Sequence, residues 1–214
     1  MEKEELYHYV DHTALKAYTT WEDIVRLCDE AIKYQTASVC VPSCYVKRIK
    51  EQYGNQITIC TVVGFPLGYA NTEGKLAETR QALEDGASEI DMVINICDVK
   101  NGAYEKVTEE IRCLKEATGN NVLKVIIETC YFTKEEKIAM CKAVTVAGAD
   151  YIKTSTGFGT NGATLSDVIL MKENIGAGVK IKAAGGIRSR EDMEAYLAAG
   201  CSRLGTSSAI EILG

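Results

Sequence analysis

The chain has 214 residues, 46% of them hydrophobic and 25% charged, and its formal net charge is −6 at pH 7. This negative charge argues against nucleic acid or an anionic membrane surface as the main partner. The acidic N-terminus lacks an apolar signal core and no apolar run approaches the ~18 residues of a membrane span, so we expect one soluble, cytoplasmic domain over residues 1–214.

Strands and helices alternate along the chain. After an expected strand at 8–15, a helix begins at Thr19-Thr20 and continues to about Tyr34. Further strands are predicted over 37–41, 57–63, 90–94, 122–127, 151–154, 179–184 and 203–205, and a helix follows each. Asp98 and Lys100 are expected in a solvated loop. Eight such units within ~200–250 residues fit a (β/α)8 TIM barrel, an α/β fold, better than an open doubly wound sheet.

A weak internal repeat supports the barrel. Segments 86–91, 148–153 and 200–205 each begin with glycine at a helix end, make one turn and enter a strand, and 35–40 is a degenerate copy. The last residues of the four copies are Cys40, Asp91, Lys153 and Gly205. If the copies superpose, these residues lie at one level near the C-terminal strand ends, where barrel enzymes keep their sites.

Lys153 ends a strand that should be apolar, because an unpaired ammonium is costly to bury. A solvated edge lysine is the plain alternative. Lys182 lies on the next predicted strand, and Lys180 shares its face. Repulsion between two close ammonium groups, together with desolvation, lowers an amine pKa. A neutral Lys153 could then attack a carbonyl and form a Schiff base, with Lys182 as the neighbour that lowers its pKa.

Asp91 is expected within reach of both lysines across the barrel. There it could hold one ammonium and act as proton donor or acceptor. The alternative is an ion pair between Asp91 and Lys182 that merely fills the barrel interior.

Glycine-rich loops follow the last three predicted strands. They are Thr156-Gly157-Phe158-Gly159, Ala184-Gly185-Gly186-Ile187-Arg188 and Leu204-Gly205-Thr206-Ser207-Ser208. Backbone N–H groups of the last two, with the N-terminus of the helix that follows, can bind an anion. In barrels a phosphate commonly lies after strands 7 and 8, so a phosphorylated substrate is predicted.

Cysteine and histidine do not form a metal motif. The nine cysteines lie mostly in apolar runs, which is typical of reduced, packed thiols. Cys40 and Cys44 are the closest pair, but no second pair or histidine accompanies them. His8 and His12 lack the glutamate of a metalloprotease helix between them, so we expect packing and polar roles for them, and neither a metal nor a cofactor.

Several phrases of the chain resemble the deoxyribose-phosphate aldolase family of class I aldolases. They are Glu89-Ile90-Asp91-Met92-Val93-Ile94-Asn95, Val125-Ile126-Ile127-Glu128-Thr129, residues 151–158 and residues 181–188, with Asp11-His12-Thr13 and Val62-Val63-Gly64-Phe65-Pro66. The resemblance implies a barrel that reversibly cleaves 2-deoxy-D-ribose 5-phosphate to acetaldehyde and D-glyceraldehyde 3-phosphate. Its partners would be sugar phosphates and aldehydes, and a homodimer is expected.

The resemblance also assigns roles. Lys153 would form the Schiff base, Lys182 would keep it neutral and assist proton movement, and Asp91 would donate or accept the proton. The positions similar to the family's phosphate contacts are Gly157, Gly185, Gly186, Arg188, Gly205, Ser207 and Ser208, and those lining the pocket are Asp11 and Cys40.

Two other functions compete with the aldolase. A metal-dependent lyase or an isomerase could use the same barrel, but two histidines close in sequence disfavour the metal enzyme and an isomerase does not need two neighbouring lysines. A non-catalytic module that binds sugar phosphates would keep the glycine loops, yet it has no use for a destabilising lysine pair.

Overall fold

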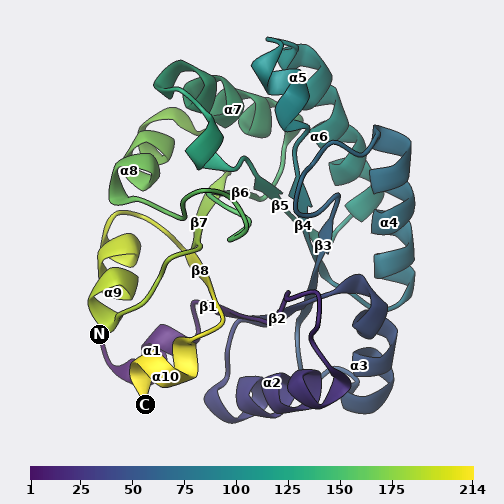
Figure 1. The fold of residues 1–214 in the computed structure, drawn as a ribbon, viewed down its shortest axis with the longest axis vertical. Helices are drawn as coiled ribbons and strands as arrows, with labels where there is room; N and C mark the ends of the chain where they lie inside the picture. The colour runs from purple at the N-terminus through teal and green to yellow at the C-terminus, as the bar shows by residue number, and fades with distance from the viewer.

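The computed structural model describes residues 1–214, in which eight parallel strands pair in chain order and β8 returns to β1, closing the ring seen in Figure 1. The predicted (β/α)8 barrel is therefore confirmed. The strands are β1 Val10–Thr13, β2 Ser38–Val41, β3 Ile59–Val63, β4 Glu89–Val93, β5 Val122–Ile126, β6 Tyr151–Lys153, β7 Lys180–Ala184 and β8 Arg203–Thr206. The helices are α1 Lys3–Tyr7, α2 Trp21–Tyr34, α3 Val46–Tyr53, α4 Thr72–Glu84, α5 Ile96–Lys100, α6 Tyr104–Thr118, α7 Lys134–Ala147, α8 Leu165–Asn174, α9 Arg190–Ala198 and α10 Ala209–Leu213, with short 3₁₀ helices at Ser43–Tyr45 and Thr129–Tyr131.

Helix ends follow the residue types that the sequence provides. Before α7, the Thr133 side chain accepts the backbone N–H of Glu136 while the Glu136 carboxylate accepts that of Thr133. The same helix ends at Gly148, whose φ of 76° is in the left-handed region. Gln35, the start of the degenerate repeat copy, has a φ of 54° after α2. The degenerate copy therefore makes the same turn as the glycine copies.

Two short helices differ from the sequence expectation. Helix α1 precedes the first strand and leaves His8 at its C-terminal end, outside β1. Helix α5 occupies the segment around Asp98 and Lys100, where a solvated loop was expected. It forms because the Asn95 side chain accepts the N–H of Asp98, and the Lys100 ammonium lies 2.8 Å from the Glu136 carboxylate.

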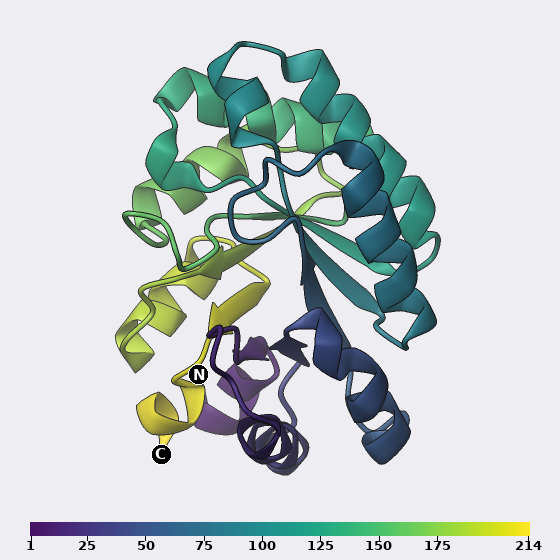
Figure 2. The ribbon, with the colours of Figure 1, turned by 45° about the vertical axis from the view of Figure 1, so that its right-hand side comes forward.

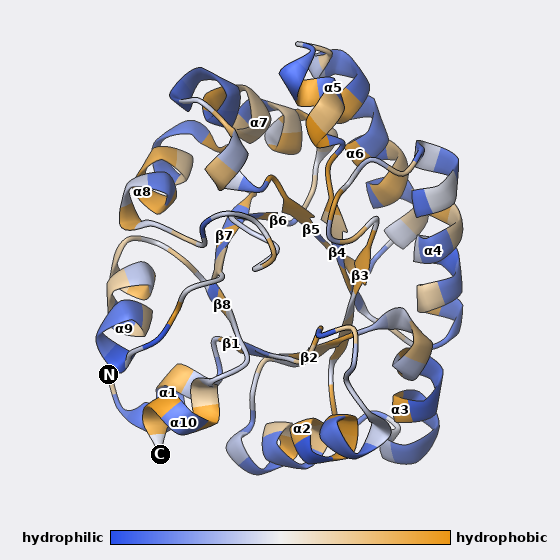
Figure 3. Cartoon of the chain, viewed as in Figure 1, coloured by the Kyte–Doolittle hydropathy of each residue, from blue (hydrophilic) through white to orange (hydrophobic).

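Apolar side chains form one core between the ring of strands and the surrounding helices. This core contains 46 buried residues. The strands differ in composition: Figure 3 shows hydrophilic residues on β1, β7 and β8, whereas β3 and β5 are mostly hydrophobic. None of the helices has the length and apolar character that a membrane span requires. Several charged side chains of the strands are nevertheless buried inside the barrel, and the candidate site lies among them.

The chain termini approach each other, and two of the loops at the C-terminal ends of the strands are in contact. The turned view in Figure 2 shows the two termini near each other, and the Lys3 ammonium donates to the Gly214 carbonyl at 2.8 Å. At the C-terminal ends of the strands, the loop after β3 meets the loop after β6. Their Phe65 and Phe158 rings pack edge to face with centroids 5.3 Å apart.

Candidate active site

Seven charged side chains from six strands meet inside the barrel, and we call them the ion cluster. They are Asp11, Glu89, Asp91, Lys124, Lys153, Lys182 and Arg203. Six of the seven are buried, and the Arg203 side chain is 13% exposed. Charged groups are almost never fully buried unless they are paired, and here they pair with one another.

Asp91 is the centre of the ion cluster. Its Oδ2 accepts the Nζ of Lys153 and the Nζ of Lys182, each at 2.7 Å, and its Oδ1 accepts the Nζ of Lys124 at 2.9 Å. Because both nitrogens contact the same oxygen at 2.7 Å, the Lys153 and Lys182 nitrogens lie at most twice this distance apart, and both point into the barrel. The two ammonium groups were expected side by side, but in the structure the Asp91 carboxylate lies between them, which weakens their repulsion.

Lys182 is held on its other side by Asp11, whose carboxylate accepts a hydrogen bond from the Lys182 Nζ. Burial disfavours the charge of Lys182, but the carboxylates of Asp11 and Asp91 outweigh it and raise the pKa of this lysine. Burial likewise opposes ionisation of Asp91, and the charges of Lys124, Lys153 and Lys182 reverse this, so the pKa of Asp91 lies well below its usual range. The surroundings thus favour the protonated form of Lys182 and the ionised form of Asp91.

The ion cluster also contains Lys124, Glu89 and Arg203. None of these three residues was expected in the site from the sequence. The Glu89 carboxylate lies 2.5 Å from the Lys124 Nζ and 3.1 Å from the Arg203 guanidinium. Despite burial, the carboxylates of Asp11 and Asp91 raise the pKa of Lys124 well above its usual value. A signal for Lys124 exists: segment 119–124 begins with a glycine at the end of α6 and is a further copy of the repeat, with Lys124 as its last residue.

The ion cluster does not balance when every member is charged. It contains three carboxylates, three ammonium groups and one guanidinium, so one positive charge is in excess. Lys153 has one carboxylate contact, with Asp91, while Lys182 contacts two carboxylates and Lys124 three. Lys153 also ends its strand and keeps 3% of its surface exposed. Of the three lysines, Lys153 therefore has the fewest contacts with carboxylates.

The four residues aligned by the repeat converge on this cluster. The Cys40 sulfur, the Cys60 sulfur and an Asp91 oxygen lie within 4.8 Å of one another. Gly205 packs against Lys182, because a Cβ at this position would come 3.1 Å from the Lys182 Cε. A larger residue in place of Gly205 would displace the lysine.

The glycine loops after β7 and β8 present unused donors. The backbone N–H groups of Gly185, Gly186 and Ser207 donate to no protein acceptor, whereas that of Ser208 donates to Thr206 Oγ1 at 3.1 Å. The backbones of Gly157 and Gly185 approach closely, since a Cβ on Gly185 would lie 3.4 Å from the Gly157 Cα. Free N–H groups at such loops are what an anion requires.

Arg188 stands beside these donors in the sequence. Its backbone N–H donates to Asp192, but its exposed guanidinium pairs with no carboxylate. It is therefore a cation without an internal partner, next to a loop with free N–H groups.

Two residues near Lys153 received no role from the sequence. Glu128 is 1% exposed, has a φ of 51°, and accepts the backbone N–H and the hydroxyl of Thr156, three residues after Lys153. Burial raises the pKa of Glu128. Ser155 is fully buried, and its hydroxyl has no partner. Glu128 therefore holds the loop after β6 in place, and the buried Ser155 hydroxyl is free to bond another group.

The remaining candidates lie away from the ion cluster. His12 contacts Glu30 of α2 at 2.8 Å and His8 contacts the Gln35 carbonyl, so the two imidazoles do not converge on one point. Lys180 is exposed at the start of β7, with its Nζ 5.6 Å from the Tyr151 ring. A surface hollow of about 490 Å³ between α2 and Ile210 contains no member of the cluster, while one of about 290 Å³ is lined by Leu15, Pro42 and Phe65 beyond the ends of β1, β2 and β3.

Comparison with known proteins gives consistent similarities over the whole chain. A family model described as DeoC/LacD family aldolase matches residues 6–207. A deoxyribose-phosphate aldolase of Clostridium botulinum strain Alaska E43 is 67% identical over 213 residues, covering 100% of this chain and 96% of that protein, and one of Clostridioides difficile strain 630 is 58% identical, covering 95% and 93%. The tetrameric deoxyribose phosphate aldolase structure from Aeropyrum pernix superposes with a TM-score of 0.92 at 32% identity, covering 99% and 91%.

Proposed function

Because the chain belongs to the DeoC/LacD family of aldolases, we propose that it is a deoxyribose-phosphate aldolase that reversibly cleaves 2-deoxy-D-ribose 5-phosphate to acetaldehyde and D-glyceraldehyde 3-phosphate. The observation that carries this proposal is the pair of lysines, Lys153 and Lys182, on one oxygen of Asp91. A carbonyl that reaches Lys153 meets a nucleophile and a proton source at the same place.

The reaction begins with the amine of Lys153. It attacks the aldehyde carbon of the open-chain sugar, and loss of water gives a protonated Schiff base. The hydroxyl on C3 then loses its proton, the C2–C3 bond breaks, and its electron pair moves into the nitrogen-bearing fragment as an enamine. Glyceraldehyde 3-phosphate leaves, the enamine takes a proton at C2, and water releases acetaldehyde and the free lysine.

The neighbours of Lys153 support these proton movements. The attack requires a neutral amine, and the one excess positive charge of the ion cluster favours that form at Lys153. Two carboxylates hold Lys182 in its cationic form before the reaction, so it can stabilise developing negative charge and then supply a proton. Asp91 bridges the two amines and relays the proton between them.

The phosphate of the substrate belongs at the loops after β7 and β8. The free N–H groups of Gly185, Gly186 and Ser207 support this placement, with Gly157, Gly205 and Ser208 shaping the same wall. Asp11 and Cys40, expected from the family resemblance to line the pocket, are fully buried, and Asp11 contacts Lys182. Bound there by its phosphate, the sugar has its aldehyde end free to reach Lys153.

Borohydride trapping tests the proposed function. Incubation with acetaldehyde and borohydride is expected to give a stable ethyl adduct on Lys153, because the reductant fixes the Schiff base. The site is located by peptide mass analysis, and the experiment is repeated with a metal chelator, which is expected to change nothing. An adduct confined to other lysines, or cleavage abolished by the chelator, would overturn the proposal.

Arg188→Met is expected to weaken use of the phosphorylated substrate selectively. Loss of a charge-assisted hydrogen bond to the phosphate costs about 1.5 to 3 kcal/mol, which corresponds to about a tenfold to a hundredfold loss in kcat/KM. Cleavage of 2-deoxyribose without phosphate, measured in parallel, is expected to stay unchanged. Equal losses with both substrates would remove Arg188 from the phosphate site.

Location and assembly are proposals of a coarser kind. A cytoplasmic location is supported by nine cysteines that are all free, five of them buried. The homodimer expected from the sequence stays a prediction, and the solved Aeropyrum pernix relative is described as tetrameric. Sedimentation velocity at several protein concentrations would decide the assembly state.

A further inference from the structure

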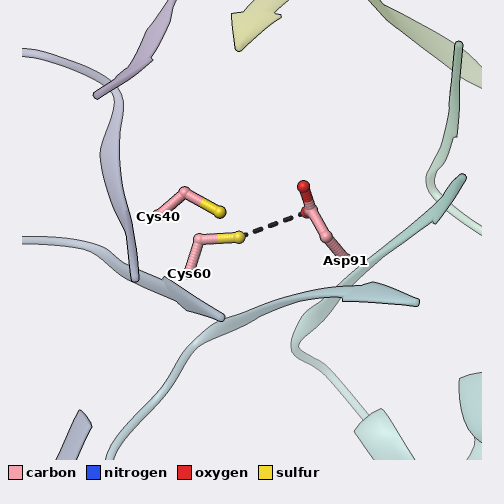
Figure 4. A group of neighbouring side chains, drawn as sticks. All are labelled: Cys40, Cys60 and Asp91. Atoms are coloured by element: carbon pink, nitrogen blue, oxygen red, sulfur yellow. Dashed lines mark hydrogen bonds between the residues drawn. The ribbon is translucent and has the colours of Figure 1, made fainter. Parts of the chain in front are cut away.

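Two cysteines stand side by side in the barrel wall. Cys40 on β2 and Cys60 on β3 are direct partners in the strand register, and both side chains are fully buried. Figure 4 shows their sulfur atoms close together, with Cys60 directed at Asp91, and all three ligand atoms lie within 4.8 Å of one another. Neither thiol takes part in the aldol steps proposed above.

The two thiols differ chemically. Cys60 donates to Asp91 Oδ1 at 3.2 Å, and burial raises its pKa well above the usual value, so it remains a thiol. For Cys40, the effect of the adjacent Cys60 side chain outweighs burial and, with the charge of Lys182, lowers the pKa of the Cys40 thiol. The wall therefore contains one thiol that is easier to ionise beside one that is harder to ionise, the arrangement of an attacking and a resolving cysteine.

The backbone geometry permits a bond between them. Neighbouring parallel strands lie about 4.7–4.9 Å apart, within the range of about 4.4–6.8 Å that disulfides span between Cα atoms.

A soft metal ion fits between Cys40, Cys60 and Asp91 less well than a disulfide does. Its third ligand would be Asp91, which already pairs with three ammonium groups whose charge repels a cation.

We propose that Cys40 and Cys60 are a peroxide-sensitive pair that closes to a reversible disulfide and slows turnover. The Cys40 thiolate attacks peroxide, an S–O bond forms as the O–O bond breaks, and hydroxide leaves and is protonated. The Cys60 thiol then attacks the sulfenic sulfur, the S–S bond forms, and the S–O bond breaks with loss of water. Overall, two thiols and one peroxide give one disulfide and two waters.

The position of the two cysteines explains both how peroxide reaches them and how the disulfide affects turnover. Access rests on the proposed function, because peroxide is smaller than the acetaldehyde that must reach Lys153, and Lys153 shares Asp91 with Cys60. After closure Cys60 has no hydrogen to donate to Asp91, which orders the two lysines. Turnover is expected to fall about tenfold, the effect of losing one hydrogen bond to a charged group.

Peroxide titration with thiol mapping tests the pair. Cys44 lies on the same tryptic peptide as Cys40, residues 34–47, so the test uses the Cys44→Ser protein. Treatment is expected to join this peptide to residues 51–75 through Cys40 and Cys60, with turnover falling in step, and dithiothreitol is expected to reverse both. Adding Cys97→Ser, which removes an exposed cysteine, is expected to change neither result.

Two variants of the pair separate the alternatives. With Cys60→Ser, Cys40 is expected to pass to sulfinic acid, which dithiothreitol does not reverse. With Cys40→Ser, Cys60 is expected to stay reduced. Free thiols in treated Cys44→Ser protein, sulfinic acid on its Cys40, a bond to another cysteine, or a disulfide with unchanged turnover would overturn the proposal. The mapping needs no turnover, so it stands apart from a failure of the aldolase proposal.

Discussion

The Lys153→Ala protein is expected to lose cleavage of 2-deoxy-D-ribose 5-phosphate by about 10⁴-fold or more, because the change removes the amine that we propose as the nucleophile. The same protein is expected to fold. Without Lys153 the ion cluster contains three carboxylates against Lys124, Lys182 and Arg203, so its charges balance. Release of glyceraldehyde 3-phosphate measures the first expectation, and thermal unfolding measures the second.

Lys180→Ala provides the matched control for this experiment. Lys180 occupies the same face of β7 as Lys182, but it is exposed at the other end of the strand. Its loss is expected to leave both turnover and unfolding unchanged. Cleavage retained in Lys153→Ala at more than a hundredth of the normal rate would exclude Lys153 as the nucleophile.

The sequence predicted the fold because its signals are local. Alternating strands and helices, caps such as Thr133 and turns such as Gly148 each depend on a few neighbouring residues, and the barrel follows from repeating them eight times. The repeat even located the level of the site, since Asp91 and Lys153 occupy equivalent positions and make contact. The short helix α5 was missed because it depends on one cap at Asn95.

The arrangement within the site could be predicted only in part, because it depends on how neighbouring strands are staggered. Asp91 is in register with Lys124, whereas Lys153 is in register with Ile126, two residues further along β5. This stagger decides that Asp91 reaches three lysines and separates two of them. Alternation within one strand gives the face of a side chain but not this offset between strands. Arg203 lies two residues before Gly205 on β8, so alternation places both on one face, and its register with Lys182 brings it to the cluster.

Replacing Lys124 with methionine is expected to shift the pH dependence of turnover to higher pH. The ion cluster then has three carboxylates and three cations, and its charges balance only while Lys153 keeps its proton. The attack needs the neutral amine. The acid limb of the kcat/KM profile is therefore expected to shift to higher pH by about one unit or more, and kcat/KM at neutral pH is expected to fall about tenfold. Stopped assays from pH 5 to 10 measure the limb.

Lys75→Met separates this effect from a loss of stability. Lys75 is as buried as Lys124 and pairs with Glu110 at 2.9 Å, but it lies outside the ion cluster. Removing one partner of a buried ion pair costs about 3–5 kcal/mol, so urea unfolding is expected to show a similar loss in both proteins. Only Lys124→Met is expected to move the pH profile. An unmoved limb in folded Lys124→Met protein would mean that Lys153 does not depend on the charge balance of the cluster, and the amine would then owe its reactivity to Lys182 and desolvation alone.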